Sequence, residues 1–179
     1  IARLASKFSG VDVDPNDHVN MSQSSNDVIP TAINLSTHCG MEHHLLPAID
    51  NLINIIDEKA KKVEGTTKTG RTHLMDAMPL DMSQELMAWS SQLRASQKSL
   101  TTVTDQLLVL PQGGTAVGTG INAHPRFSIE FAKEVSRIEK IKAKPSDNFF
   151  HSLSSQDTSL QLSGEMRNLA TVLMKISND

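Results

Sequence analysis

The sequence predicts an all-α fold, part of a long helical bundle, on three observations. Aromatic residues make up only 3% of the 179 residues and Tyr is absent, so the core must be aliphatic. Apolar residues recur at helical spacing in several segments, whereas no segment alternates apolar and polar residues over the length of a strand. The longest pattern repeats every seven residues, at Leu86, Leu93, Leu100 and Leu107. These observations favour packed helices over a β-sandwich or barrel.

The first half of the chain is predicted to hold a surface loop and two helices. Pro and Asx residues crowd residues 12–17 and favour turns there. A capped helix begins near Asn26, and Pro47 interrupts it by removing a backbone donor and clashing with the preceding turn. An amphipathic helix then runs to about Gly65.

The second half is predicted to hold three more helices. The leucine repeat lies on a long helix that ends at Pro111, and its Ser, Thr and Gln flanks place it inside a multi-helix bundle. A Gly-rich turn at residues 113–120 leads to a shorter helix over 127–138. A polar linker at 142–150 precedes the last helix, whose apolar stripe covers residues 162–176.

Charge and composition exclude several classes of function. A formal net charge of −3 provides no basic field, so we expect no nucleic-acid partner. No apolar run reaches the roughly 18–20 residues of a membrane span, so we expect no membrane partner. The single cysteine, Cys39, excludes an internal disulfide framework and favours a cytoplasmic location, or a mitochondrial one if a leader lies upstream. The absent initiator Met leads us to expect a piece of a longer protein.

Two polar segments are candidates for chemistry. Residues 20–27 place Ser, Asn and Gln side chains directly before a helix, where N–H groups and the helix dipole favour an anion; the alternative is simple helix capping. Residues 70–80 are predicted to form a loop that contains Arg71-Thr72-His73. A loop His can transfer a proton near neutral pH, although most isolated His residues have no such role.

Two other segments resemble known binding motifs less well. Residues 38–44 hold three His, one Cys and one Glu, but they lack the H-E-x-x-H spacing of a metal-binding helix. The Gly-rich turn has Thr119 where a phosphate-binding loop needs Lys, so no nucleotide site is expected. We interpret this turn as backbone that bends tightly or approaches a ligand closely.

Three segments in fixed order resemble the class II fumarases of the fumarase/aspartase superfamily. They are residues 19–32, residues 70–80 and residues 113–122, and the ending at 173–179 is similar too. The resemblance implies a central helical bundle, a homotetramer whose active sites are shared between chains, and no metal or organic cofactor. It also implies reversible hydration of fumarate to (S)-malate in the tricarboxylic acid cycle, by proton abstraction through an aci-carboxylate intermediate.

The resemblance also implies roles for individual residues. His73 would belong to the proton-transfer machinery. The positions that would bind the substrate are Ser24, Ser25, Asn26 and Thr72. A second dicarboxylate site would map to the turn-rich segment, at Asp14, Pro15, Asn16 and Asp17. Fumarases commonly have His where this chain has Asp14, and a carboxylate there repels a dianion.

Parts of the family pattern are absent from the 179 residues. Neither the G-S-S-x-M-P-x-K-x-N loop, which carries the general base Ser, nor an upstream S-G-T motif occurs. We therefore expect residues 1–23 to end an N-terminal domain, residues 24–179 to form part of the central bundle, and the isolated chain to be inactive. Two alternatives to a fumarase remain open. One is an aspartate ammonia-lyase, which typically has Gln in place of His73, and the other is a catalytically silent helical assembly module.

Overall fold

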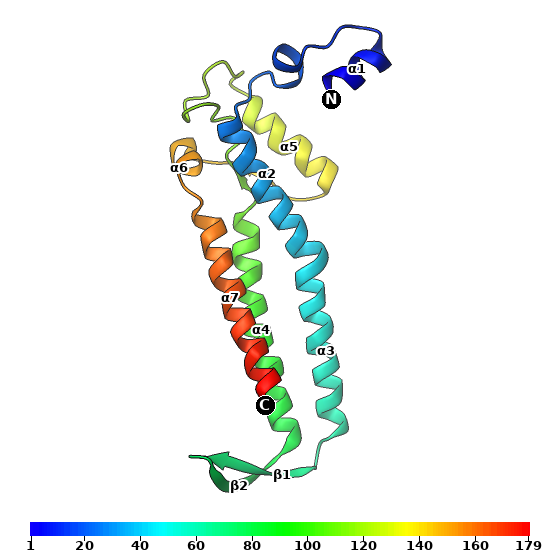
Figure 1. The fold of residues 1–179 in the computed structure, drawn as a ribbon, viewed down its shortest axis with the longest axis vertical. Coiled ribbons are helices and arrows are strands. Elements are labelled where there is room, and N and C mark those ends of the chain that lie inside the picture. The colour runs from blue at the N-terminus through cyan, green and yellow to red at the C-terminus, as the bar shows by residue number, and fades with distance from the viewer. The chain divides into compact units, whose positions relative to one another are not determined.

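The computed structural model describes residues 1–179 and is dominated by helices, as predicted (Figure 1). Two small two-stranded sheets complete it. The chain forms two compact units, one of residues 1–38 and 106–159, the other of residues 39–105 and 160–179. None of the helices combines the length and the apolar character that crossing a bilayer requires.

The first unit combines helices of different lengths with a long irregular loop. Strand β3 pairs in parallel with β4, and the segment between β3 and α5 holds the Gly-rich turn. Its elements are α1 (Ala2–Ser9), the π-helical turn η1 (Pro15–Val19), most of α2 (Ser25–Gly40), β3 (Val109–Leu110), α5 (Phe127–Glu139), β4 (Lys144–Pro145) and α6 (Phe149–Ser154).

The second unit contains the long helices, with a β-hairpin at one end (Figure 1). Its elements are η2 (Met41–Leu45), α3 (Leu46–Lys62), β1 (Thr67–Thr72), β2 (Met75–Asp81), α4 (Met82–Gln106) and most of α7 (Asp157–Asn178).

Side-chain hydrogen bonds show how the long helices of the second unit lie. Asp57 bonds Ser90 and Asp50 bonds Gln97, so α3 and α4 run antiparallel. Trp89 on α4 donates to the Asp179 carboxylate, which follows α7, at 3.0 Å. The hairpin of β1 and β2 connects α3 to α4.

The first three leucines of the repeat form the buried stripe of α4, which confirms the sequence interpretation, and the fourth, Leu107, is buried just after the helix ends. Leu93 and Leu100 are fully buried, and Leu86 is 6% exposed. On α3 the buried side chains also follow a helical period, as expected for one face of an amphipathic helix. They are Leu46, Ile49, Ile53, Ile56 and Ala60.

Pro47 interrupts the α-helical hydrogen bonding more gently than expected. It lies in the first turn of α3, where its missing N–H costs little. The five residues before α3 form the π-helical turn η2 between α2 and α3, so the helical path continues from one helix to the other.

The largest correction concerns residues 70–80, which are not a loop. They form most of an antiparallel hairpin in which Thr67 pairs with Asp81 and Thr72 with Met75. The pairing shifts register at Gly70, where an added Cβ would clash with the Met78 carbonyl oxygen. A strand of Thr, Lys and Arg that buries little lacks the apolar alternation by which strands are recognised.

Three smaller differences also have local causes. The expected loop at residues 12–17 overlaps the single turn η1, which runs on to Val19 and is held by its own backbone and by the Asp14 side chain. The long helix ends at Gln106, before Pro111, because β3 begins at Val109. The linker at 142–150 includes β4 and the start of α6, whose N-cap is Asn148.

We expect Leu93→Ala to lower the free energy of unfolding by about 3 kcal/mol, since it removes a fully buried side chain and leaves a cavity. Chemical denaturation of the full-length protein at fixed concentration measures this. Met87→Ala, on the same helix but 60% exposed, is the matched control and should cost far less. Equal losses for both variants would contradict the assignment of the core.

Candidate active site

The polar cluster before α2 is organised by a buried acid, Asp27, which is 0% exposed. Its Oδ1 accepts a hydrogen bond from the Ser24 backbone N–H at 2.9 Å. Its Oδ2 accepts from the backbone N–H groups of Gly113 at 3.1 Å and Thr115 at 2.9 Å. The carboxylate therefore ties the start of α2 to the Gly-rich turn nearly ninety residues later in the chain.

The predicted substrate-binding residues Ser24, Ser25 and Asn26 lie at this junction. The Asn26 side-chain amide donates to the Ala116 carbonyl at 2.7 Å, a second link to the turn. The Ser24 hydroxyl accepts from the Asn26 backbone N–H at 3.2 Å. Ser25 is exposed and its side chain makes no hydrogen bond. The junction thus leaves neutral polar groups at a helix N-terminus, where an anion is favoured.

The Gly-rich turn is tight because it packs against helices. A Cβ added at Gly113 would lie 2.5 Å from the Ser128 Cβ on α5. One added at Gly114 would lie 2.8 Å from Leu153 Cδ1 on α6. The sequence interpretation was a tight bend or a close approach to a ligand; the structure shows a close approach to helices α5 and α6 instead.

Thr72 and His73 lie at the tip of the β1–β2 hairpin. Because Thr72 pairs with Met75, the connection is the two-residue loop His73-Leu74. Both loop residues have left-handed backbone angles, with φ of 49° and 59°, the pattern of a type I′ turn. Thr72 and His73 are exposed, and neither side chain makes a hydrogen bond within this chain. The tip therefore presents a hydroxyl and an imidazole that are free to bind.

The structure gathers some of the predicted site residues and not others. Ser24, Ser25 and Asn26 come together with the Gly-rich turn in the first unit. Thr72 and His73 belong to the second unit. Of the three groups of candidate residues, only the one at α2 has a contact that ties it to another of the motifs found in the sequence.

The segment proposed as a second dicarboxylate site, residues 14–17, folds around the Asp14 carboxylate. Its Oδ1 accepts from the backbone N–H groups of Asn16 at 2.7 Å and Asp17 at 2.8 Å. These bonds, led by that from Asp17, hold the pKa of Asp14 below its ordinary value. The carboxylate caps its own turn, and the second site at Asp14, Pro15, Asn16 and Asp17 stays a prediction.

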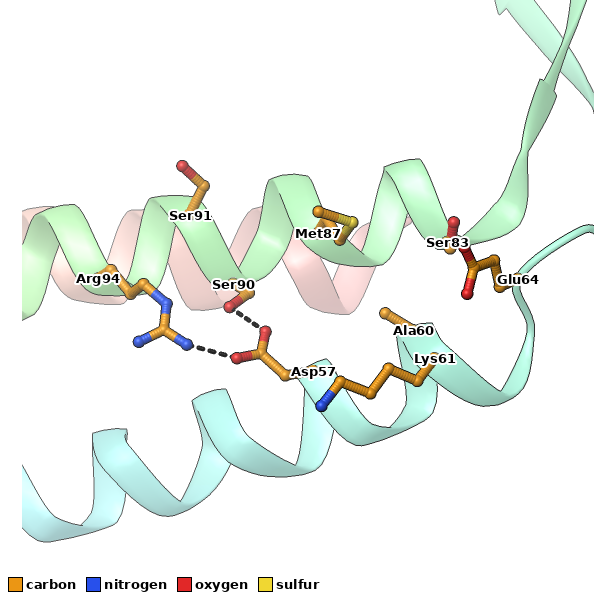
Figure 2. Close-up of a pocket in the computed structure, with 9 residues that line it drawn as sticks. All are labelled: Asp57, Ala60, Lys61, Glu64, Ser83, Met87, Ser90, Ser91 and Arg94. Carbon is orange, nitrogen blue, oxygen red and sulfur yellow. Dashed lines mark hydrogen bonds and ion pairs between the residues drawn. The ribbon is translucent and has the colours of Figure 1, made fainter.

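A groove between α3 and α4 has a volume of about 510 Å³ (Figure 2). Figure 2 shows the Asp57 carboxylate between Ser90 and Arg94. Ser90 donates to Asp57 at 2.5 Å, and Arg94 forms an ion pair with it. These partners lower the pKa of Asp57, the Ser90 hydroxyl most. The acid is fully engaged in joining two helices, and none of the nine lining residues is a predicted site residue.

The His-rich segment at residues 38–44 does not form a metal site. No group of three or more His, Cys, Asp or Glu side chains anywhere in the chain is placed to hold a metal ion. His38 is buried, while Glu42, His43 and His44 are exposed, so the segment distributes its candidate ligands between interior and surface.

Comparison with known proteins identifies the family. A lyase family profile matches residues 1–179, the whole chain. The chain belongs to this lyase family. It is 49% identical over all 179 residues to fumarate hydratase class II 2 of Pseudomonas aeruginosa, covering 39% of that protein. It is 45% identical over 179 residues to a class II fumarate hydratase of Xylella fastidiosa, covering 38% of it.

Solved structures of the lyase family agree with the fold. The class II fumarase of Schistosoma mansoni superimposes with a TM-score of 0.95 at 36% identity, covering 99% of this chain and 41% of that one. The resemblance to class II fumarases and the helical fold are therefore confirmed. The chain spans about two fifths of the length of these relatives. The boundary expected at residue 23 concerns the longer protein and stays a prediction.

Asp27 is the residue that sequence reasoning missed. It belongs to the polar run at 20–27, but an acid in the first turn of a helix is ordinarily explained by the helix dipole. Nothing in the local sequence indicates that its second oxygen accepts from Gly113 and Thr115. The one available signal was the presence of both segments in a single family pattern.

The lowered pKa of Asp57 predicts a pH-dependent contribution to stability. Its folded-state pKa lies below the ordinary value of 3.8, so its stabilising effect is complete above that value and is lost as the pH falls through the folded-state pKa. We expect Asp57→Asn to lower the melting temperature at pH 7, with a smaller difference from the unmodified protein below pH 4.

Thermal unfolding of the full-length protein at both pH values checks this expectation. Asp105→Asn, on an exposed side chain of α4 without a hydrogen bond or ion pair, controls for the loss of one charge. A difference between Asp57→Asn and the unmodified protein that is the same at both pH values would show that the ionised carboxylate does not stabilise the groove.

Proposed function

We propose that the longer protein containing this chain is a fumarate hydratase, which reversibly hydrates fumarate to (S)-malate. The observation that supports this most is the 49% identity, over the whole chain, to a protein named fumarate hydratase class II 2. The site agrees with the proposal, because neutral donors at the α2 N-terminus and an unpaired imidazole suit a small dianion and a proton transfer.

The difficult step of this reaction is removal of a weakly acidic proton from carbon. The neighbouring carboxylate must accept the resulting negative charge as an aci-carboxylate, so donors have to surround it. In our proposal Ser24, Ser25 and Asn26 hold one carboxylate of the substrate, and the Thr72 hydroxyl donates to it as well. His73 takes part in the proton transfer, while the general base lies outside these 179 residues.

Assembly and location are part of the same proposal. Thr72 and His73 belong to one unit and Ser24, Ser25 and Asn26 to the other, and each group leaves side chains without partners. We propose a homotetramer in which residues from different chains complete each active site, without a metal or organic cofactor. We place the protein in the cytoplasm, or in mitochondria if a leader precedes this chain.

We expect the full-length protein to hydrate fumarate and not to release ammonia from aspartate. The absorbance of fumarate, followed with fumarate, malate or aspartate as substrate, measures all three conversions on one enzyme preparation. If the protein deaminates aspartate and does not hydrate fumarate, our proposal is wrong and the protein is an aspartate ammonia-lyase.

We expect His73→Asn in the full-length protein to lower kcat about 100-fold or more, the scale of a lost acid–base group. His43→Asn is the matched control, because His43 is exposed and its side chain makes no hydrogen bond. Steady-state kinetics with malate measures both variants. If the unmodified protein is active and His73→Asn turns over at a near-normal rate, His73 has no role in proton transfer. The assignment as a hydratase would then still stand.

A further inference from the structure

We propose that Asp27 is a positioning residue for substrate binding, acting through Ser24, Ser25 and Asn26. The inference rests on the proposed function, since it concerns the same site. It starts from the bonding of one side chain: Asp27 is 0% exposed and its two oxygens accept three hydrogen bonds, all from backbone N–H groups.

The bonding pattern of Asp27 is that of a carboxylate that only accepts. No ion pair in the chain includes it, so no cation offsets its burial. A buried carboxylate without a cation depends on its hydrogen-bond donors for stability in the interior. The three N–H groups are therefore held in place around Asp27, and they belong to two distant segments of the chain.

The two segments that Asp27 joins are those that shape the proposed binding cluster. Oδ1 fixes Ser24, the first residue of that cluster, and Oδ2 fixes the turn whose Ala116 carbonyl accepts from Asn26. Two other buried side-chain atoms, Gln112 Nε2 just before the turn and Thr115 Oγ1 within it, have no hydrogen-bond partner, so they do not share this role. Asp27 thus sets the position of the groups that bind substrate, although Asp27 itself is buried and does not touch the substrate.

Asp27→Asn tests this inference with an almost isosteric change. An Asn offers one oxygen and one NH₂ group, so the amide must point its NH₂ at the Ser24 N–H or at the N–H pair of Gly113 and Thr115. On that side two N–H donors face each other, so the hydrogen bonding to one of the two segments is lost. Loosened binding of substrate and transition state alike raises KM and leaves kcat nearly unchanged.

We expect Asp27→Asn in the full-length protein to raise the KM for fumarate about tenfold or more while kcat changes less than about threefold. Asp57→Asn is the matched control: it is the same chemical change at an acid that joins α3 and α4, and it should lower stability with KM unchanged. A change in KM at nearly constant kcat distinguishes a positioning role from a general loss of structure. A general loss of structure lowers the fraction of folded enzyme and therefore the apparent kcat.

Circular dichroism first establishes that each variant is folded at the assay temperature. If Asp27→Asn does not fold, Asp27→Glu takes its place, since it keeps the charge and both acceptors but shifts them by one methylene. A folded variant at position 27 with KM within about twofold of the unmodified protein, or with a loss confined to kcat, would overturn the inference. An unmodified protein that fails to hydrate fumarate would instead overturn the proposed function, and the inference with it.

Discussion

The local geometry of the first unit depends on three hydrogen bonds that backbone N–H groups donate to one buried carboxylate, that of Asp27. Leaving such a buried partner unsatisfied costs about 1–3 kcal/mol for each group, so the start of α2 and the Gly-rich turn are fixed as a pair. The glycines follow from this constraint. With the turn held at Asp27, its backbone lies so close to α5 and α6 that a Cβ at Gly113 or Gly114 has no room.

The second unit is held together by a different balance of forces. Its ion pair between Asp57 and Arg94 is partly exposed, and such surface pairs contribute about 0–1 kcal/mol. The fully buried Leu93 and Leu100 contribute more, at about 1.5–3 kcal/mol for each side chain. Apolar burial therefore stabilises this unit more than the ion pair does, while the polar groups along the groove link α3 to α4.

The fold was predictable where periodicity is strong, and the site only where the motif is local. The seven-residue leucine repeat predicted α4 and its buried stripe, and the apolar spacing at 127–138 predicted α5. The hairpin was missed because β1 is polar, whereas β2 is mostly apolar but does not alternate apolar and polar residues and contains Pro79, and because both strands are largely exposed. The contact of Asp27 with Gly113 and Thr115 was missed because a link across more than eighty residues leaves no trace in local spacing.

The backbone at the hairpin tip is strained, and no interaction within the hairpin offsets the free-energy cost of this strain. His73 and Leu74 both occupy left-handed backbone conformations, which disfavour residues with side chains by about 1–2 kcal/mol, whereas Asn-Gly would fit this turn without strain. The exposed Arg71–Asp76 pair across the strands is too weak to offset that cost. The sequence His73-Leu74 does hold an imidazole at the tip with no partner from its own chain. Strained backbone of this kind is typical of functional sites, which agrees with the proposal that His73 takes part in proton transfer.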